Sequence, residues 1–491
     1  DVSYPPDGFG DYSTNLAFLI AKKTGEKTEK VAEEIVEKLK SEFPEDFEKI
    51  EVAKNGFINL HLSKDYLRKN TSKTLDFPGV GKGKTIIIDY SQPNIAKTMH
   101  VGHIRTTLLG DALANIYESL GYKVIRWNYL GDWGTQFGKL IAAYKMWGED
   151  DEVKKNPIQV LDNLYVRFHK EMKTSASRRT ELEDMGRAEF KKLEEGDKEN
   201  KRLWKWFRDE SLKEFDKIYD VLGIRFDTYM GESGFEGDLK PLIKDLRDKG
   251  IAQESEGAII VNLDKFDLPP ALIQRSDGAS LYLTRDIAAL RHRLKEYKPE
   301  KILYVVGNEQ SLHFEQLAAV AKVMGLEAKI AHVKFGLILG PDKKKFSSRV
   351  GKAVSMAELL DKAIELSGKD VGIGALKYFV LKEHRNTDIV FDWKKILDLK
   401  GTSGPYLQYT YARLVGIKKK AGPVRALNFK TLKSETEWSL AKKLIKFPEA
   451  AAAAAEGNLT NILTLYLYEL CNLANKFYET SPVLSEEDDK V

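Results

Sequence analysis

The fold is decided by residues 86–138, which read IIIDYSQPNIAKTMHVGHIRTTLLGDALANIYESLGYKVIRWNYLGDWGTQFG. The apolar, β-branched run Ile86–Ile88 predicts a buried strand, and the polar segment Asp89–Met99 predicts a loop. A helical spacing of apolar residues then begins at about Gly102 and stops before Gly121. Because 123–127 again has a strand pattern, the stretch predicts a strand–loop–helix–strand unit.

Two histidines, His100 and His103, flank Gly102 where the predicted helix begins. The first turn of a helix has free backbone N–H groups and the positive end of the helix dipole, so it attracts anions. A glycine at this point lets a ligand lie against the backbone. The loop is therefore a predicted polyphosphate site.

The same loop carries a family resemblance. His100-Val101-Gly102-His103 matches the H-x-G-H signature of class I aminoacyl-tRNA synthetases, a short motif that also occurs by chance. The longer frame S-Q-P-N-I-A-K-x-M-H-V-G-H, followed by N-Y-L-G-D-W-G-T-Q-F-G, is far more specific and resembles arginyl-tRNA synthetases. The resemblance implies a multidomain α/β protein with a doubly wound parallel-sheet (Rossmann-like) catalytic domain. It also implies a mostly helical insertion, a small N-terminal α+β domain and a C-terminal α-helical bundle.

The composition is compatible with this interpretation. The 491 residues are 42% hydrophobic and 31% charged, which is typical of soluble globular proteins. The net charge of only +4 means that any RNA-binding charge is patched rather than global. A single cysteine, Cys471, excludes an internal disulfide and a cysteine-rich metal framework, so we expect a cytoplasmic protein without a tightly bound structural metal. No apolar run approaches the ~20 residues that span a membrane. The chain begins at Asp1 rather than methionine, so we expect its natural N-terminus to lie further upstream.

Three domains are expected. Residues 1–74 contain a predicted hairpin around Asn55–Gly56, and the phrases G-D-Y-S-T-N and G-F-I-N-L resemble the N-terminal domain of arginyl-tRNA synthetases, which meets the tRNA elbow. A structural cap on the next domain is the alternative. Residues 75–395 form the expected catalytic domain, with an insertion at about 139–257 and a signature-loop region at about 340–395. Residues 396–491 are expected to be a helical anticodon-binding domain, cut short at its C-terminus.

Strand and helix patterns alternate again after the insertion, with predicted strands at 258–263, 301–307 and 332–339. Alternation on both sides of an insertion predicts one doubly wound parallel sheet, whose ligands lie beyond the carboxyl ends of its strands. Asp89, Tyr282 and Gln310 fall at or just after such predicted ends.

Recognition of a guanidinium group calls for carboxylates that accept its paired N–H donors. By resemblance, Asp89, Tyr282 and Asp286 hold the arginine side chain, although family members generally carry Glu where Asp89 stands. An N-cap or a surface ion pair is the alternative for Asp286. Asn94 and Gln310 are expected to hold the amino-acid backbone. The complete expected arginine-binding set is Asp89, Gln92, Pro93, Asn94, His103, Tyr282, Asp286 and Gln310.

Adenylate formation depends mainly on positioning and on stabilising charge at the phosphates of ATP, which is expected to bind as its Mg²⁺ complex. The usual K-M-S-K-S signature is replaced by K-F-S-S-R, so Ser348 stands where the second lysine would be. Our hypothesis is that Lys97 supplies the missing charge, assisted by Lys345 and Arg349. A solvated surface turn is the alternative for Lys343–Lys345. The expected catalytic residues are Lys97, His100, Gly102, His103, Lys345 and Arg349, and the expected ATP ligands are Ser91, His100, Gly102, His103 and His313.

The C-terminal phrase S-G-P-Y-L-Q-Y-T-Y-A-R offers aromatic and basic side chains on which unstacked RNA bases can stack. Burial inside a helical bundle is the alternative for the same residues. The expected partners are tRNA(Arg), L-arginine and ATP, with no membrane, and the chain is expected to be a monomer. The candidate tRNA-binding residues are Tyr406, Gln408, Tyr409, Tyr411 and Arg413.

Together these features predict an arginine–tRNA ligase with no editing domain. A cysteinyl synthetase would be expected to show cysteine or histidine zinc ligands, and one cysteine argues against it. A small nucleotidylyltransferase shares H-x-G-H but does not need the helical C-terminal domain. A catalytically silent tRNA-binding paralogue is disfavoured by the intact residues Asp89, His100, His103, Asp286 and Gln310.

Overall fold

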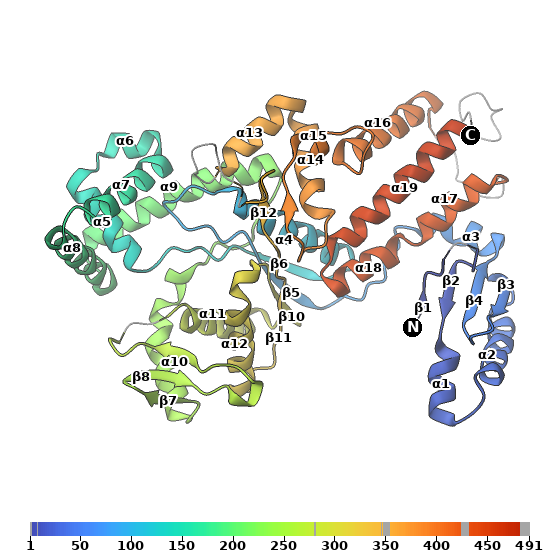
Figure 1. Cartoon of the computed structure of the whole chain (residues 1–491), viewed down its shortest axis with the longest axis horizontal. Helices are drawn as coiled ribbons and strands as arrows, with labels where there is room; N and C mark the ends of the chain where they lie inside the picture. Colours follow the sequence, from blue (N-terminus) through green and yellow to red (C-terminus); the bar gives the residue numbers. More distant parts are fainter. Residues whose placement is uncertain are drawn as a thin grey trace. The chain divides into compact units, whose positions relative to one another are not determined.

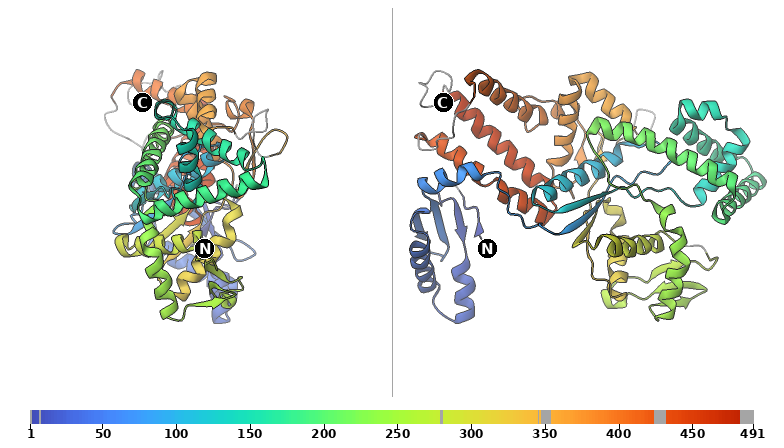
Figure 2. Two further views of the ribbon diagram at one scale, coloured as in Figure 1. Left: turned by 90° about the vertical axis from the view of Figure 1, so that its left-hand side faces the viewer. Right: turned by 180° about the vertical axis from the view of Figure 1, so that it is seen from behind.

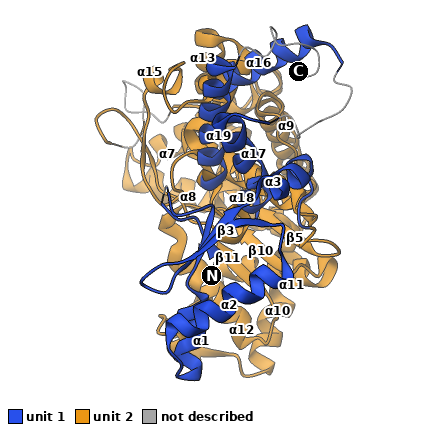
Figure 3. Ribbon diagram, turned by 90° about the vertical axis from the view of Figure 1, so that its right-hand side faces the viewer, with its two compact units in different colours: residues 1–78, 407–453, 462–491 blue, residues 79–406, 454–461 orange. Residues whose placement is uncertain are grey.

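The computed structural model describes residues 2–6, 8–278, 281–344, 346, 354–423 and 432–481. Its contacts divide the chain into two compact units, coloured separately in Figure 3. The sheet unit comprises Gly79–Tyr406 and Ala454–Asn461, and the terminal unit comprises Asp1–Pro78, Leu407–Ala453 and Ile462–Val491.

The sheet unit is built on four parallel strands in the order β11-β10-β5-β6 (Figure 1). These strands are β5 (Thr85–Asp89), β6 (Lys123–Trp127), β10 (Lys301–Tyr304) and β11 (Lys329–His332). Ile86–Ile88 are at most 1% exposed, which is typical of a parallel strand covered on both faces. The connection from β5 leads to β6 on one side, and the one from β10 leads to β11 on the other. The order of the strands therefore reverses between β5 and β10, where open α/β sheets place their ligands.

The predicted strand–loop–helix–strand unit is confirmed. Helix α4 (Val101–Ser119) connects β5 to β6, and α12 (Ser311–Val323) connects β10 to β11 after the short turn η4 (Asn308–Gln310). Leu108, Leu109 and Leu113 of α4 are buried, in agreement with the helical spacing of the apolar residues.

Five helices follow β6 and make up most of the insertion: α5 (Thr135–Trp147), α6 (Asp150–Lys155), α7 (Pro157–Glu171), α8 (Ala176–Glu195) and α9 (Lys198–Leu222). Figures 1 and 2 show α5–α8 gathered together, with the long α9 leading back toward the sheet. The chain then continues through η2 (Glu232–Phe235) and α10 (Glu236–Asp248).

The strand predicted near Ile259 is not part of the parallel sheet. Strands β7 (Ala252–Ser255), β8 (Ala258–Val261) and β9 (Ala271–Gln274) form a separate antiparallel sheet, with η3 (Asp264–Phe266) between β8 and β9. The reason is the two-residue turn Glu256–Gly257, whose φ angles of 51° and 77° close a tight hairpin. Helix α11 (Tyr282–Tyr297) follows this sheet.

The strand predicted at 332–339 is divided between two sheets. Its first residue ends β11, and its last two form β12 (Ile338–Leu339), which pairs in parallel with β13 (Ile389–Val390). Helices α13 (Met356–Ser367) and α14 (Lys369–Leu381) lie between these two strands in sequence, and α15 (Trp393–Ile396) follows them.

The terminal unit contains an antiparallel sheet in the order β1-β2-β4-β3. It pairs β1 (Val2–Ser3), β2 (Tyr12–Thr14), β4 (Ile58–Leu62) and β3 (Phe47–Val52), beside α1 (Leu16–Thr24), α2 (Thr28–Glu42), α3 (Lys64–Asn70) and η1 (Thr71–Lys73). The predicted hairpin around Asn55–Gly56 is thus confirmed as β3–β4.

The C-terminal part is helical, as expected: α16 (Gly404–Ala421), α17 (Glu435–Ile445), α18 (Phe447–Gly457) and α19 (Thr460–Thr480). Trp438 of α17 packs with Leu62 and Leu67, and both Tyr4 and Tyr12 donate hydrogen bonds to Glu449, at 2.6 and 2.7 Å. These contacts join the N-terminal sheet to helices from the other end of the chain. Among the described helices, none combines the length and the hydropathy that a membrane crossing requires.

Candidate active site

The loop after β5 has an unusual backbone. Ser91, Gln92 and Ala96 have positive φ angles of 74°, 52° and 58°, which residues other than glycine rarely adopt. Their N–H groups donate to Thr106 Oγ1 (3.1 Å), Asn128 Oδ1 (3.1 Å) and Ser211 Oγ (2.8 Å), respectively. The strained loop is therefore fixed by hydrogen bonds that it donates to acceptors on α4, on the segment after β6 and on α9.

Asn94 owes its position to a glycine. Its exposed side chain lies against Gly131, where a Cβ atom would stand 1.8 Å from Asn94 Oδ1. Backbone hydrogen bonds from Ile95 to Gly131 (3.2 Å) and from Gly131 to Pro93 (3.1 Å) hold the two segments together. The first glycine of G-D-W-G thus gives the Asn94 amide its space.

The two signature histidines cap α4. Gly102 N–H donates to His100 Nδ1 (3.0 Å), and His100 N–H donates to His103 Nδ1 (3.1 Å). A neutral imidazole that accepts at Nδ1 carries its proton on Nε2, so in this tautomer each ring presents an Nε2–H donor. His103 Nδ1 also lies 3.3 Å from His100 O, a longer contact than the one to His100 N. Burial, with a smaller effect of His100, lowers the pKa of His103 to about 3, so this ring is neutral at pH 7. A Cβ atom at Gly102 would lie 2.7 Å from the His100 ring, which explains the glycine.

A cavity of about 120 Å³ lies beside this helix start. Val101 N–H donates to Val354 O (2.9 Å), and Met356 N–H donates to Met99 O (2.8 Å), so the segment after the K-F-S-S-R loop is attached to the H-x-G-H segment. Lys345 and Arg349 fall outside the described residues. The cavity is lined by His100, Val101, Gly102, Arg105, Phe335, Gly336, Leu337, Ile338 and Phe346.

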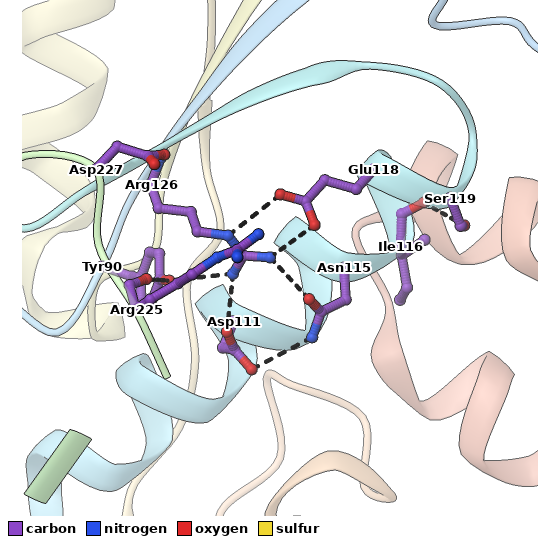
Figure 4. A network of polar contacts seen from close by, with 9 residues as sticks. All are labelled: Tyr90, Asp111, Asn115, Ile116, Glu118, Ser119, Arg126, Arg225 and Asp227. Atoms are coloured by element: carbon purple, nitrogen blue, oxygen red, sulfur yellow. Dashed lines mark hydrogen bonds and ion pairs between the residues drawn. The ribbon is translucent and has the colours of Figure 1, made fainter. Parts of the chain in front are cut away.

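A buried arginine network braces the same helix (Figure 4). Arg126, which is 2% exposed, donates to Asp111 (2.8 Å), Asn115 (2.7 Å) and Glu118 (3.0 Å) of α4. Its Nη1 also lies 3.4 Å from the hydroxyl of Tyr90, the first residue of the strained loop. Arg126 thereby ties β6, α4 and this loop into one frame.

Asp89 has a partner that the sequence did not reveal. It is 1% exposed; its Oδ2 accepts from Arg293 Nη2 at 2.5 Å, and its Oδ1 accepts from Gln92 Nε2 at 2.8 Å. Arg293 stacks over Trp127, with 4.4 Å between its guanidinium carbon and the ring centroid. Burial raises the pKa of Asp89, and the charge of Arg293 opposes that shift. The charge of Asp89 is therefore balanced within the protein.

Asp286 and His313 meet across α11 and α12. His313 Nε2 lies 2.5 Å from Asp286 Oδ2, and both side chains are about one-fifth exposed. The structure thus places His313, expected at ATP, against an expected arginine ligand. Tyr282 begins α11 one turn before Asp286 and is 64% exposed, and Gln310 ends the exposed turn η4. Tyr282 follows the antiparallel strand β9, so its expected place at the end of a parallel strand is wrong.

Glu232 is a carboxylate of this region that sequence reasoning missed. It is 7% exposed, and its Oε2 is buried without a hydrogen-bond partner. Burial raises the pKa of Glu232 to about 8; Arg285 opposes this shift, and Asp286 adds to it. Its sequence context, G-E-S-G-F, carries none of the motifs used above. Only its position in the fold, close enough to Asp286 to be affected by its charge, reveals it.

Lys97 lies against the insertion. Its Nζ is 5.0 Å from the centroid of the Tyr165 ring of α7, a cation–π distance. Lys97 also lowers the pKa of His169 of α7, after the larger effects of burial and of Lys139. The structure therefore brings Lys97, near the end of the loop after β5, against helix α7 of the insertion.

The other expected residues are distributed as follows. Ser91 is buried, and its hydroxyl lies 2.8 Å from Tyr219 OH, so it faces inward. Tyr409 and Tyr411 are 52% and 71% exposed, which disfavours burial in a bundle core for these two. Arg413 lies between Tyr409 and Tyr478, at 4.8 and 4.6 Å, whereas Tyr406 and Gln408 are partly buried. Within the described ranges, no group of three or more histidine, cysteine, aspartate or glutamate side chains is arranged to hold a metal ion.

Comparison with known proteins gives matches along the whole chain. The family described as "tRNA synthetases class I (R), catalytic domain" matches residues 70–393. The "Arginyl tRNA synthetase N terminal domain" matches residues 2–62, and the "DALR anticodon binding domain" matches residues 407–491. The parallel sheet and the histidine-capped helix are thus those of a class I aminoacyl-tRNA synthetase.

Comparison with individual proteins narrows the assignment within class I. "Arginine--tRNA ligase 1" of Bacillus cereus is 41% identical, with 99% of this chain and 89% of that protein covered. "Arginine--tRNA ligase" of Enterococcus faecalis is also 41% identical, over 96% and 87% of the two chains. The solved arginyl-tRNA synthetase of Plasmodium falciparum superimposes with a TM-score of 0.80 at 29% identity, over 100% of this chain and 89% of that one. The chain belongs to the arginyl-tRNA synthetase family.

Proposed function

We infer that the chain is an arginine–tRNA ligase. In the first step the arginine carboxylate attacks the α-phosphorus of ATP, the bond to the β-phosphate oxygen breaks, and pyrophosphate leaves. In the second step a hydroxyl of the 3′-terminal ribose attacks the arginyl carbonyl, and AMP leaves. The observation that carries this conclusion is similarity to arginine–tRNA ligases at 41% identity across 99% of the chain.

We propose that the guanidinium of the substrate binds Asp286 and Glu232, beside Tyr282. The state of the buried groups supports this choice: Asp89 is already paired with Arg293, whereas Glu232 has a buried oxygen without a hydrogen-bond partner. A guanidinium placed beside Glu232 would favour its charged form. Asp286 keeps a carboxylate oxygen besides the one bound to His313. Because a lysine cannot match the planar fork and would leave buried oxygens unpaired, the pocket rejects it without an editing domain.

Asp89, with Gln92 and Pro93, shapes the loop beside the proposed arginine site and does not bind the guanidinium. Its ion pair with Arg293 fixes the start of the loop, while Asn94 and Gln310 hold the amino and carboxyl groups of arginine. Both amides are exposed at the carboxyl edge of the sheet, one after β5 and the other after β10. They therefore flank the point where the strand order reverses.

ATP, as its Mg²⁺ complex, binds at the start of α4. The Nε2–H groups of His100 and His103 donate to its phosphates, and Gly102 lets the nucleotide lie against the backbone. Support comes from the backbone N–H groups that lie against Nδ1 of both rings and from the adjoining cavity of about 120 Å³. Lys97, Lys345 and Arg349 stabilise the charge that develops on pyrophosphate, which is the main demand of this step.

The tRNA is bound by the remaining parts of the chain. Residues 1–74 contact the tRNA elbow, and the exposed rings of Tyr409 and Tyr411, with Arg413, contact the anticodon loop in the domain from about residue 396. Stacking on exposed aromatics is the usual way in which proteins read unpaired RNA bases. The enzyme acts as a monomer in the cytoplasm, where translation consumes its product.

Aminoacylation tests the proposal directly. The full chain is incubated with ATP, Mg²⁺, labelled arginine and a transcript of tRNA(Arg), with a lysine tRNA transcript as the matched control. Acid-precipitable arginine should accumulate on the first RNA alone. Failure to charge tRNA(Arg), or equal charging of both transcripts, would overturn the assignment.

A further inference from the structure

Arg105 is a buried cation beside the ATP cavity that plays no part in the mechanism above. It lies on α4, two residues after His103, and is 1% exposed. Its Nη1 donates to Leu337 O (3.3 Å) and its Nη2 donates to Arg385 O (3.0 Å). Its Nε is buried without a hydrogen-bond partner. Both of these acceptors are backbone carbonyls, which carry no formal charge.

Arg126 and Arg293, two other deeply buried guanidiniums in the described part of this unit, have a different environment. Arg126 contacts Asp111 and Glu118, and Arg293 contacts Asp89. For Arg105, burial lowers the pKa to about 10, opposed by the charges of Asp388 and Glu383, so the side chain is still protonated at pH 7. A buried charge held by neutral acceptors is costly, and a residue needed only to join two segments would not require it.

The position of the Arg105 guanidinium beside the cavity indicates which ligand it serves. Arg105 lines the same cavity as His100 and Gly102, whose backbone forms the positive N-terminal end of α4. The opposite wall, Phe335–Ile338, accepts one of its two hydrogen bonds. A charge removed from water acts over a longer distance than an exposed one, because it is screened less. The cavity therefore combines a helix terminus with a fixed positive charge.

We propose that Arg105 is a positioning residue for ATP, whose buried charge draws the nucleotide phosphates to the start of α4 while its hydrogen bonds hold the opposite wall of the cavity. This inference rests on the proposed function and deepens it, because it assigns a source of ATP affinity outside the H-x-G-H and K-F-S-S-R segments. Arg105 does not contact the reacting atoms. It acts through the field in the cavity and through the wall strand.

Two substitutions distinguish the effect of the Arg105 charge from the effect of its hydrogen bonds. Arg105→Lys keeps the charge, and Arg105→Gln keeps N–H donors without it. Kinetics of ATP–pyrophosphate exchange, with arginine saturating and tRNA(Arg) present throughout, should give Arg105→Lys an ATP KM within about threefold of the unsubstituted enzyme. Arg105→Gln should raise the ATP KM about tenfold, as expected for one charge ~10 Å away in a medium of effective dielectric constant ~20. The arginine KM should stay unchanged in both.

A third variant predicts an effect of opposite sign. Asp388 Oδ1 accepts from Leu337 N–H (2.6 Å), and Asp388→Asn keeps that acceptor while it removes a negative charge near Arg105. The ATP KM should fall about twofold, less than for Arg105 because Asp388 is exposed. A purely structural role predicts no tightening. Since Asp388→Asn preserves the hydrogen bond, it tests the inference even if Arg105→Gln does not fold.

The matched control is Arg385→Gln. The Arg385 side chain donates to Lys334 O (2.8 Å), just before the wall segment, but is partly exposed, so its loss should change the ATP KM by less than about threefold. An unchanged ATP KM in a folded Arg105→Gln enzyme, or a raised one in Asp388→Asn, would overturn the inference. If the unsubstituted enzyme shows no arginine-dependent exchange, the proposed function fails instead, so the two failures are distinguishable.

Discussion

Substitution of Asp286 by asparagine tests how arginine is recognised. The change keeps the shape of the side chain and removes its charge, at a position where the carboxylate is 18% exposed and already bonded to His313 at 2.5 Å. A hydrogen bond to a charged group contributes about 1.5–3 kcal/mol, which corresponds to about 10–100-fold in binding. We therefore expect the arginine KM to rise by that factor. The ATP KM should change less than threefold, because the phosphates are expected at the start of α4.

Both constants are measured by ATP–pyrophosphate exchange with tRNA(Arg) present, each substrate being varied while the other is saturating. The matched control is Asp245→Asn on α10, whose partly exposed carboxylate pairs with Lys249 and Arg291 and is not part of the proposed site. This variant should behave as the unsubstituted enzyme. Equal increases of the two KM values in Asp286→Asn would refute the reasoning, since a general distortion and not a lost guanidinium contact would then explain them.

Three further outcomes follow from the structure. Burial raises the pKa of Glu232 from 4.5 to about 8, so between these values the folded protein holds a proton that the unfolded chain releases, and stability declines as the pH rises from about 5 to 9. Thermal unfolding across this range should show a smaller decline of Tm with pH for Glu232→Gln than for the unsubstituted protein. Identical declines in the two proteins would contradict the assignment. Gly131→Ala places a Cβ atom 1.8 Å from Asn94 Oδ1 and should raise the arginine KM at least tenfold, whereas Gly237→Ala, which meets nothing within 4 Å, should not. Arg126→Met leaves Asp111 and Glu118 unpaired, so the free energy of unfolding measured with denaturant should fall by about 3–5 kcal/mol. A decrease below about 1 kcal/mol would be incompatible with the buried network.

The sequence was most informative where local chemistry determines structure. The strand Ile86–Ile88, the helix start at His100–His103 and the stop at Gly121 are all set by residues close together in the chain, and the structure places them as predicted. The hairpin β7–β8 was not foreseen, although Glu256–Gly257 is a two-residue turn. Apolar residues such as Ile259 suit a parallel or an antiparallel strand equally well, so they do not tell which sheet a strand joins.

The charges of the site were less predictable, because they depend on residues distant in sequence. From the sequence, Asp89 is expected to be a free carboxylate at a strand end, yet in the structure it is paired with Arg293, which is 204 residues further along the chain. Glu232 enters the same region from the turn η2 before α10, and nothing in its immediate neighbours marks it. A resemblance transfers the motif residues to a new chain, but the balance of charge around them becomes visible only when the fold brings these partners together.

The most direct test of the account is ATP–pyrophosphate exchange measured separately with each of the twenty amino acids, with and without tRNA(Arg). The proposed arginine site at Asp286, Glu232 and Tyr282 predicts that arginine alone supports exchange, because only a guanidinium matches both acceptors. Exchange supported by lysine or cysteine in place of arginine would contradict the central claim.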